Sequence, residues 1–198
     1  MPALHLLAGP DGAGKSSYAH DVLVPVTSLP FINADEIAAE KWPTDQVEHA
    51  YEAARIAEAR RRATIAEGSS FVSETVFSHP GKVDLVADAV AAGYLVHLHV
   101  AMVPVELTVQ RVFERVRRGG HTVPEEKIRE RYDRLWDHVH QAISIADVVD
   151  VLDNSSASAP FRVCASFEHG ELIGPANWPR WTPSVLLGGG QHPNPGAL

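Results

Sequence analysis

A glycine-rich segment near the start of the chain has the residue types that bind a nucleotide phosphate. Gly9, Gly14, Lys15 and Ser16 match the P-loop pattern G-x-x-x-x-G-K-[ST]. An apolar run at residues 3–8 precedes the segment and a helix is expected after it, which is the context that the pattern requires. The backbone N–H groups of the loop and the partial positive charge at the start of the helix bind phosphate. Lys15 reaches the β- and γ-phosphates, and Ser16 offers a hydroxyl to Mg²⁺.

These features predict a binding site for ATP or GTP with Mg²⁺, against the alternative of a glycine turn that carries a surface lysine. The predicted nucleotide-binding residues of the loop are Gly9, Pro10, Asp11, Gly12, Ala13, Gly14, Lys15, Ser16 and Ser17.

Two carboxylates follow the next strands expected along the chain. Asp35 comes just after residues 31–33, and Glu74 lies near the end of residues 71–75. In a parallel sheet both positions face the edge that carries the P-loop. Asp35 is placed to accept a proton from an acceptor hydroxyl, but aspartate is equally favoured as the N-cap of the helix that follows. Glu74 could orient magnesium-bound water or hold substrate hydroxyls, against the alternative of a surface acid.

A cluster of arginines lies between residues 105 and 143. The first three share one helix face because they are spaced i, i+4 and i+7. Gly119-Gly120-His121 then interrupts the helix, and three more arginines follow on the next one. Two arginine-bearing helices around a glycine hinge resemble a lid that closes on phosphates. For any single arginine, the favoured interpretation is a solvent-exposed side chain that pairs with a glutamate. For the cluster as a whole, the favoured interpretation is a phosphate-binding lid. The arginines are Arg111, Arg115, Arg118, Arg129, Arg131 and Arg134.

Strand and helix signals alternate along the chain, which predicts an α/β fold of the P-loop NTPase type. We expect a mainly parallel sheet with helices on both faces and a helical arginine lid. Pro25 and Pro30 mark a loop, and Thr44 is expected to cap the third helix. Strands are expected at 3–8, 31–33, 71–75, 94–102 and 148–152, and helices at about 14–23, 35–41, 45–67, 80–92, 105–118 and 124–143.

The length of 198 residues predicts one domain. We expect a kinase domain at residues 1–187, with a lid at about 105–143 and a C-terminal hairpin at about 161–174. Residues 188–198 are rich in glycine and proline, which predicts a flexible tail.

Charge and composition exclude several classes of protein. Seventeen basic and 25 acidic residues give a net charge of −8, which argues against a general nucleic-acid binder. No apolar run is long enough to span a bilayer, and the first residues lack the basic segment of a signal peptide. Cys164 is the single cysteine, so no intramolecular disulfide can form, and it is expected to be a small buried side chain. The expected location is the cytoplasm.

Other signals are interpreted as structural. His97 and His99 share a strand face, but no third ligand is evident, so no metal site is expected there. Arg60-Arg61-Arg62 is expected on the solvated side of the long helix. Trp178 and Trp181 are expected to pack the C-terminal segment onto the body of the protein.

Four segments, taken together, resemble the zeta-toxin family of P-loop kinases over about residues 4–156. The stretch Gly119-Gly120-His121-Thr122-Val123-Pro124, with Arg131-Tyr132 downstream, is more specific than the P-loop. The segments are Gly9–Ser17, Phe31-Ile32-Asn33-Ala34-Asp35, Phe71-Val72-Ser73-Glu74-Thr75, and Arg115–Pro124 with Arg131-Tyr132.

The resemblance implies a kinase that transfers the γ-phosphate of ATP to the 3′-hydroxyl of the amino sugar in UDP-N-acetylglucosamine. On that basis Asp35 is the base and Lys15 and Ser16 hold phosphate and magnesium. The family's two phosphate-clamping arginines correspond to Arg118 and Arg131. Glu74 helps to position substrate and metal, with Thr75 beside it at the substrate, and Asp153-Asn154 borders the nucleotide base.

The resemblance also implies a partner, because family members can have a separate antitoxin protein. Two alternatives remain open at this point. The same fold could phosphorylate another hydroxyl compound, such as an antibiotic or a different nucleotide sugar. The chain could also be an ATP-dependent switch without an acceptor, although an acceptor base and an arginine lid argue against a switch.

Overall fold

The computed structural model describes residues 1–117 and 123–188 and contains a seven-stranded sheet in the order β2-β3-β1-β4-β5-β6-β7. The first five strands are parallel, and the last two are antiparallel additions at one edge. The strands are β1 (Ala3–Ala8), β2 (Phe31–Ile32), β3 (Phe71–Thr75), β4 (Leu95–Met102), β5 (Val148–Asp153), β6 (Arg162–Glu168) and β7 (Glu171–Leu172).

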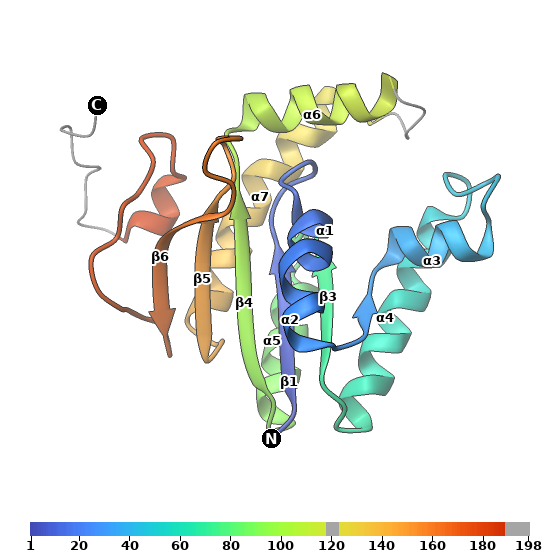
Figure 1. The fold of residues 1–198 in the computed structure, drawn as a ribbon, viewed down its shortest axis with the longest axis horizontal. Coiled ribbons are helices and arrows are strands. Elements are labelled where there is room, and N and C mark those ends of the chain that lie inside the picture. Colours follow the sequence, from blue (N-terminus) through green and yellow to red (C-terminus); the bar gives the residue numbers. More distant parts are fainter. Residues whose placement is uncertain (118–122, 189–198) are drawn as a thin grey trace.

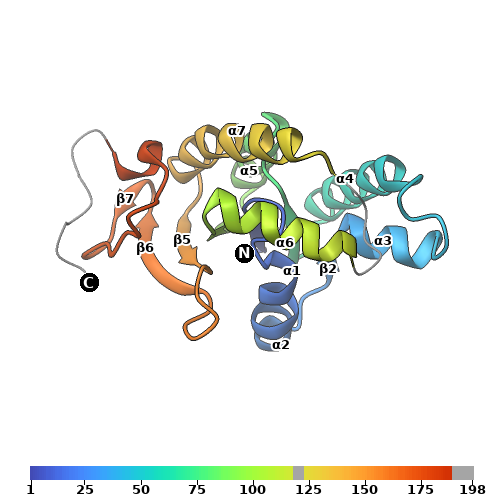
Figure 2. The same ribbon diagram turned by 90° about the horizontal axis from the view of Figure 1, so that it is seen from above.

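Helices cover both faces of this sheet, as the α/β prediction requires (Figures 1 and 2). Helices α4, α5 and α7 lie on one face, α1 and α2 lie on the other, and α6 crosses above the carboxyl ends of the strands. The helical elements are α1 (Lys15–Tyr18), η1 (Ala19–Leu23), α2 (Val24–Thr27), α3 (Ala34–Lys41), α4 (Ala50–Ala66), α5 (Gly81–Ala91), α6 (Val105–Arg117), α7 (Glu125–Ile143) and η2 (Ser184–Leu187).

Successive strand residues point to opposite faces of the sheet, so the sheet separates a large hydrophobic core on one face from a small one on the other. On β1, Leu4 and Leu6 point into the main core beside α5 and α7, whereas Leu7 packs with Ala19 and Val72 under α1. Strand β4 follows the same alternation, with Val96, Leu98, Val100 and Met102 in the main core. The intervening residues of β4 therefore face the side that carries α1, and they include both histidines of this strand.

The helix after the P-loop extends further than expected. It continues to Thr27 through a π-helical turn, η1, and Pro25 lies in the first turn of α2 instead of in a loop. Pro25 has no N–H to donate within this continuous helical run, and the π-helical turn η1 directly precedes α2. Ser28 ends the element in the left-handed conformation with φ 56°.

The prediction that Thr44 caps a helix beginning at residue 45 was wrong. Helix α4 begins at Ala50, and the Thr44 hydroxyl donates to the Asp45 carboxylate instead. The segment before α4 is held by the rings of Trp42 and His49, which stack with centroids 4.4 Å apart. Residues 46–49 form turns before α4, so the helix starts five residues later than expected.

The C-terminal segment forms the expected hairpin, in which β6 and β7 pair through His169 and Gly170. Trp178 and Trp181 pack against the main core, as predicted. Cys164 is buried, and burial raises the pKa of its thiol to about 12, so the prediction of a structural cysteine is confirmed. Within the described ranges no helix has both the length and the apolar character needed to cross a bilayer. The predicted tail, apart from Gly188, lies outside the described residues.

Candidate active site

The P-loop connects β1 to α1 at the point in the sheet where the strand order reverses. Ligands of open α/β sheets bind in the crevice outside the strand ends at such a point. Gly9 and Gly14 have φ angles of 148° and 87°. A Cβ on Gly9 would lie 2.3 Å from the Ala101 carbonyl oxygen, and one on Gly14 would lie 2.5 Å from Asn154 Nδ2. Both positions thus need glycine for backbone conformation and for space.

Lys15 is folded back onto the loop that precedes it. Its ammonium group donates to the carbonyl oxygens of Gly9 and Pro10 at 3.0 and 2.9 Å, and the side chain is buried. Carbonyl dipoles hold the charge here in the way that phosphate oxygens would. A bound nucleotide must therefore replace these two neutral carbonyl oxygens with stronger hydrogen-bond acceptors for the Lys15 ammonium group.

A second group of side chains supports the loop from behind. Asn154 Nδ2 donates to the Ala13 carbonyl at 2.8 Å, and Arg111 donates to the carbonyls of Gly12 and Asn154, each at 3.0 Å. Asp153 pairs with Arg162 at 3.0 Å and accepts from the Ser155 amide. The structure thus places Asp153 and Asn154 beneath the loop, where Asn154 fixes the backbone of the phosphate-binding segment.

Glu74 and Ser16 form the candidate magnesium ligands. The Ser16 hydroxyl donates to Glu74 Oε2 at 2.9 Å. Burial raises the pKa of Glu74, although Lys15 and the Ser16 hydrogen bond act in the opposite direction. Mg²⁺ prefers oxygen ligands and keeps several waters, so a hydroxyl and a carboxylate beside the P-loop fit this ion.

The capping question for Asp35 is answered by its neighbour, Asn33. Asn33 Oδ1 accepts from the amides of Asp35 and Glu36 at 2.6 and 3.3 Å, which makes Asn33 the N-cap of α3. The alternative that Asp35 is the N-cap was therefore wrong. Because Asn33 satisfies the helix end, the carboxylate of Asp35 is available to the cavity that it lines.

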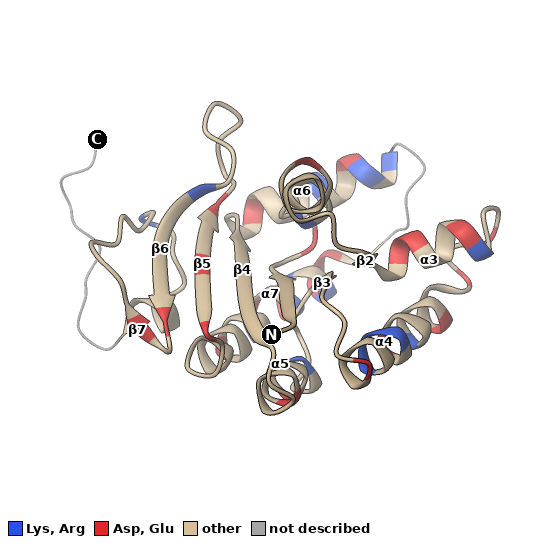
Figure 3. Ribbon diagram, turned by 60° about the horizontal axis from the view of Figure 1, so that its bottom comes forward, with Lys and Arg blue, Asp and Glu red and all other residues tan. Residues whose placement is uncertain are grey.

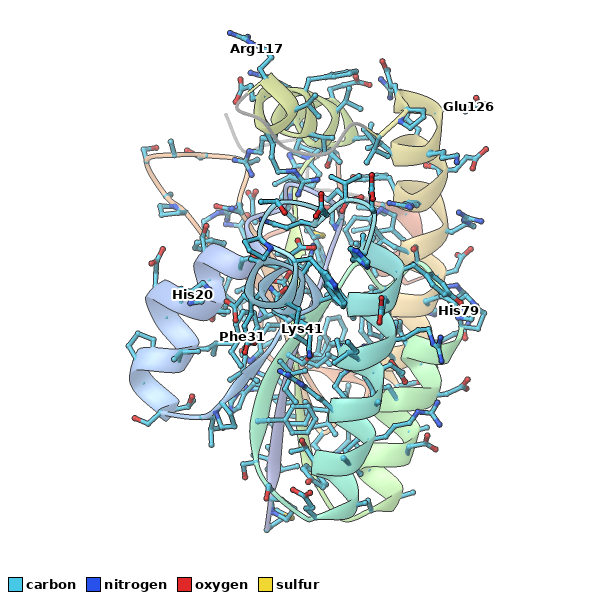
Figure 4. The ribbon with its side chains drawn as sticks, turned by 90° about the vertical axis from the view of Figure 1, so that its right-hand side faces the viewer. His20, Phe31, Lys41, His79, Arg117 and Glu126 are labelled. Carbon is cyan, nitrogen blue, oxygen red and sulfur yellow. The ribbon has the colours of Figure 1, made fainter. Side chains whose placement is uncertain are left out.

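The arginines between residues 105 and 143 occupy different surroundings. Arg115 and Arg131 line the cavity, and Arg131 lies 3.5 Å from the Asp11 carboxylate. Arg129 is paired with Glu106 and Glu125 at 2.8 Å, and Arg117 points away from the body of the protein (Figure 4). Arg118, with Gly119-Gly120-His121-Thr122, lies outside the described residues.

Much of the segment predicted as a lid packs against the body of the protein. From Tyr132 onward α7 belongs to the main core, where Leu135 and Trp136 are buried. Helix α6 packs through Val109 and Val112 in a small separate cluster that also contains Ile128. Helix α6 thus packs on the first turns of α7 and is joined to the P-loop by Arg111.

A cationic part of the site was missed. Arg61, expected on the solvated side of α4, is buried, and its guanidinium donates to the Ser73 hydroxyl at 3.3 Å and to Glu58 at 2.9 Å. Lys82 of α5 reaches the same Glu58 carboxylate at 3.1 Å. The buried residues of α4 are Ala53, Ala57 and Arg61, so the spacing of four from two alanines was the signal that could have found this arginine.

These groups line one cavity of about 510 Å³ at the carboxyl end of the strands. Figure 3 shows acidic residues along α3 and basic residues on the neighbouring helix α4. Of the predicted site residues, the lining contains Asp11, Gly12, Gly14, Lys15, Ser16, Ser17, Asp35, Glu74, Thr75 and Arg131, and it also contains Asn33, Ala54, Arg61, Ser78, Lys82 and Arg115.

Solved structures share this fold at low sequence identity. The AvrRxo1-ORF1:AvrRxo1-ORF2 complex with sulphate ions has a TM-score of 0.66 at 16% identity, covering 87% of this chain and 60% of that chain. The same complex with ATP has a TM-score of 0.58 at the same identity and coverage. The protein described here thus spans three fifths of the AvrRxo1 chain that it matches.

Two further structures extend the comparison. The PezAT toxin-antitoxin system of Streptococcus pneumoniae has a TM-score of 0.54 at 15% identity, covering 77% of this chain and 68% of that chain. Shikimate kinase from Acinetobacter baumannii in complex with shikimate has a TM-score of 0.51 at 17% identity, covering 80% and 87%. These likenesses establish the fold of P-loop kinases.

The sequence comparisons are more specific about the family. No match was found among curated proteins. The family model described as Zeta toxin matches residues 1–162, which include the P-loop, both candidate carboxylates and the arginine-bearing helices. The chain therefore belongs to the Zeta toxin family.

Proposed function

We propose that the protein is a kinase that transfers the γ-phosphate of ATP to a hydroxyl group of a small molecule. The observation that carries this proposal is that Asp35 lines the same cavity as Lys15 and Ser16 while Asn33 caps α3. A nucleotide-dependent switch needs no carboxylate at that position, whereas a kinase needs a group that orients and deprotonates the acceptor hydroxyl.

The roles of the residues follow from their positions. Lys15 exchanges its two carbonyl partners for phosphate oxygens, and Ser16 and Glu74 would hold the magnesium ion, which neutralises phosphate charge when it is bound. Arg131, with Arg115 or Arg118, supplies positive charge as the γ-phosphoryl group moves. Asp35 accepts the proton of the attacking hydroxyl.

The acceptor we propose is a nucleotide sugar, with the 3′-hydroxyl of the amino sugar in UDP-N-acetylglucosamine as the preferred site. Membership of the Zeta toxin family supports this choice. The charge of the cavity lining also supports it, because Arg61 and Lys82 suit an acceptor that carries phosphate, and Glu58 balances part of their charge. Another nucleotide sugar or an antibiotic hydroxyl remains the second choice of acceptor.

A separate antitoxin protein is the proposed macromolecular partner. The family match supports this, as does the likeness in fold to the PezAT toxin-antitoxin system. The proposal is tested by co-purification of the tagged chain with the product of an adjacent reading frame, followed by the effect of that product on phosphoryl transfer.

The experiment that tests the kinase compares wild type with Asp35→Asn. A panel of nucleotide sugars is incubated with ATP or GTP and Mg²⁺, and a product heavier by about 80 Da, one phosphoryl group, identifies the acceptor by mass spectrometry. Asparagine keeps the shape of aspartate but cannot take the proton. Transfer should fall by roughly 10²–10⁴-fold, while Mg-ATP binding measured by titration calorimetry stays near the wild-type value.

Glu36→Gln is the matched control, because Glu36 is the next carboxylate on the same turn and pairs with the exposed His20. Its transfer rate should equal that of wild type. If Asp35→Asn transfers phosphate at nearly the wild-type rate, Asp35 is not the base. Loss of both ATP binding and transfer would place Asp35 with the magnesium ligands. ATP binding by wild type without any phosphorylated product would favour a switch.

A further inference from the structure

A cluster of three histidines lies on the sheet face that carries α1. His5 of β1 is in register with His97 of β4, and His99 follows two residues later on the same face. Each ring offers one nitrogen to the cluster, and these nitrogens all lie within 4.8 Å of one another. The sequence pattern of His97 and His99 gave no third histidine, and the structure supplies one. This residue is His5, which is remote in sequence and is brought beside the pair by the parallel pairing of β1 with β4.

A hydrogen bond to Asp150 orients the His97 ring and leaves one of its nitrogens without a proton. His97 Nε2 lies 2.8 Å from Asp150 Oδ2, and Ser166 donates to the other oxygen of that carboxylate at 2.6 Å. A carboxylate that accepts the N–H of one ring nitrogen leaves the lone pair on the other, which is the arrangement common around metal-bound histidines. His97 Nδ1 is therefore the nitrogen that remains for a ligand.

The other two rings approach each other as two ligands of one ion do. His5 Nδ1 and His99 Nε2 are 3.1 Å apart. Two nitrogens that share a tetrahedral zinc ion are separated by about 3.3 Å, given bonds of about 2.0–2.1 Å. In the absence of an ion, one of the two nitrogens must carry the proton of a hydrogen bond.

His99 is the least solvated member of the cluster. It is 2% exposed, and its Nδ1 has no hydrogen-bond partner in the part of the chain that the structure describes. Burial, together with the adjacent His97 and His5, lowers the pKa of His99 to about 2, and burial and His97 also lower the pKa of His5. The burial of His99 and its unpartnered Nδ1 distinguish this ring from the partly exposed rings of His5 and His97.

The surroundings leave the site accessible to solvent. Helix α1 lies over β1, and Tyr18 from it contacts the His99 ring with centroids 5.6 Å apart. Figures 1 and 2 show that the described helices on this face leave β4, β5 and β6 uncovered. The side chains of His97 and Asp150 are accordingly 22% and 25% exposed. An ion held by three histidines could thus take its fourth ligand from water.

We propose that His5, His97 and His99 form a binding site for a transition-metal ion, with Zn²⁺ as the expected occupant and Asp150 as the residue that orients His97. Three imidazole nitrogens suit Zn²⁺, whereas Mg²⁺ prefers oxygen ligands. This site differs from that of Ser16 and Glu74 in residues and in donor chemistry. The proposal does not depend on the proposed kinase activity.

The test measures binding of Zn²⁺ to the full chain, expressed without a polyhistidine tag. Titration calorimetry with zinc chloride should give one site per chain that excess Mg²⁺ does not displace, and Co²⁺ in its place should give the strong visible absorption of a tetrahedral ion. His5→Ala and His97→Ala should each weaken Zn²⁺ binding by at least roughly 100-fold, and Asp150→Asn by roughly 10–100-fold.

His140→Ala is the control, since His140 is an exposed histidine of α7 outside the cluster and should bind Zn²⁺ as wild type does. Circular dichroism and thermal melts verify that each variant folds. If the variants of β4 do not fold, His5→Gln, at a partly exposed position, tests the same site. Absence of Zn²⁺ binding in wild type would overturn the proposal, as would equal affinities in His5→Gln and His140→Ala.

Discussion

Glu58 should make the stability of the fold depend on pH in the acidic range. Its carboxylate accepts from Arg61 and Lys82 at 2.9 and 3.1 Å, and Arg62 lies 3.2 Å away. Burial alone raises the pKa of Glu58, but the hydrogen bonds from Arg61 and Lys82 outweigh it and hold the pKa at about 2, against 4.5 ordinarily. At full strength this shift corresponds to about 3 kcal/mol. Because the side chain is 27% exposed, screening reduces the expected contribution to about 1–2 kcal/mol.

The sign follows from the direction of the shift. A pKa lowered by folding adds stability above the unfolded value of 4.5, and this stability is lost as the pH falls from 4.5 toward 2. Urea unfolding of wild type and Glu58→Gln from pH 7 to pH 2.5 measures the effect. The difference in unfolding free energy should be constant above about pH 5.5 and shrink below pH 4.5, whereas Glu130→Gln, at an exposed position of α7, should show no such trend. A difference that stays constant down to pH 2.5 would refute the reasoning.

Three further predictions concern the nucleotide site. Lys15→Ala should reduce phosphoryl transfer by roughly 10²–10³-fold, since the loop loses its cationic phosphate ligand, and unchanged turnover at saturating ATP would contradict this role. Arg131→Ala should lower kcat more than ATP affinity, because the charge of Arg131 acts on the moving phosphoryl group. Steady-state kinetics and calorimetry measure the two quantities. The control is Arg129→Ala, because the Arg129 guanidinium is paired with Glu106 and Glu125. Gly14→Ala should cost more in Tm than Gly93→Ala, because both have positive φ but a Cβ at position 14 alone would meet Asn154 and Phe161.

The order of elements was accessible from the sequence because each one has a strong local signal. Apolar strands alternate with amphipathic helices, and Gly93 follows α5 in the position favoured for the end of a helix. The errors lie where local rules compete. Pro25 has the residue type of a loop but lies in α2, and Thr44 has the residue type of a cap but is followed by turns before α4 begins.

The candidate site was accessible only where its residues follow strand ends. Asp35 and Glu74 could be identified because parallel strands carry the residues after them to one edge of the sheet. Arg61 and His5 gave no such signal. Arg61 enters the cavity lining because α4 crosses Ser73, and His5 reaches the histidine pair because β1 lies beside β4. The first contact depends on how α4 packs on β3, and the second on a strand order that brings together residues 94 positions apart in the chain.

The end of β3 shows how one register serves two parts of the proposed reaction. Successive strand residues project to opposite faces, so Glu74 points toward α1 and meets Ser16, whereas Ser73 points toward α4 and meets Arg61. Thr75 projects to the same side as Ser73 and also lines the cavity. In the proposed reaction, β3 therefore lies between the magnesium and phosphate ligands on one side and the residues available to the acceptor on the other. A slip of β3 by one residue would exchange these sides, because Glu74 would face Arg61 and the P-loop would lose its carboxylate.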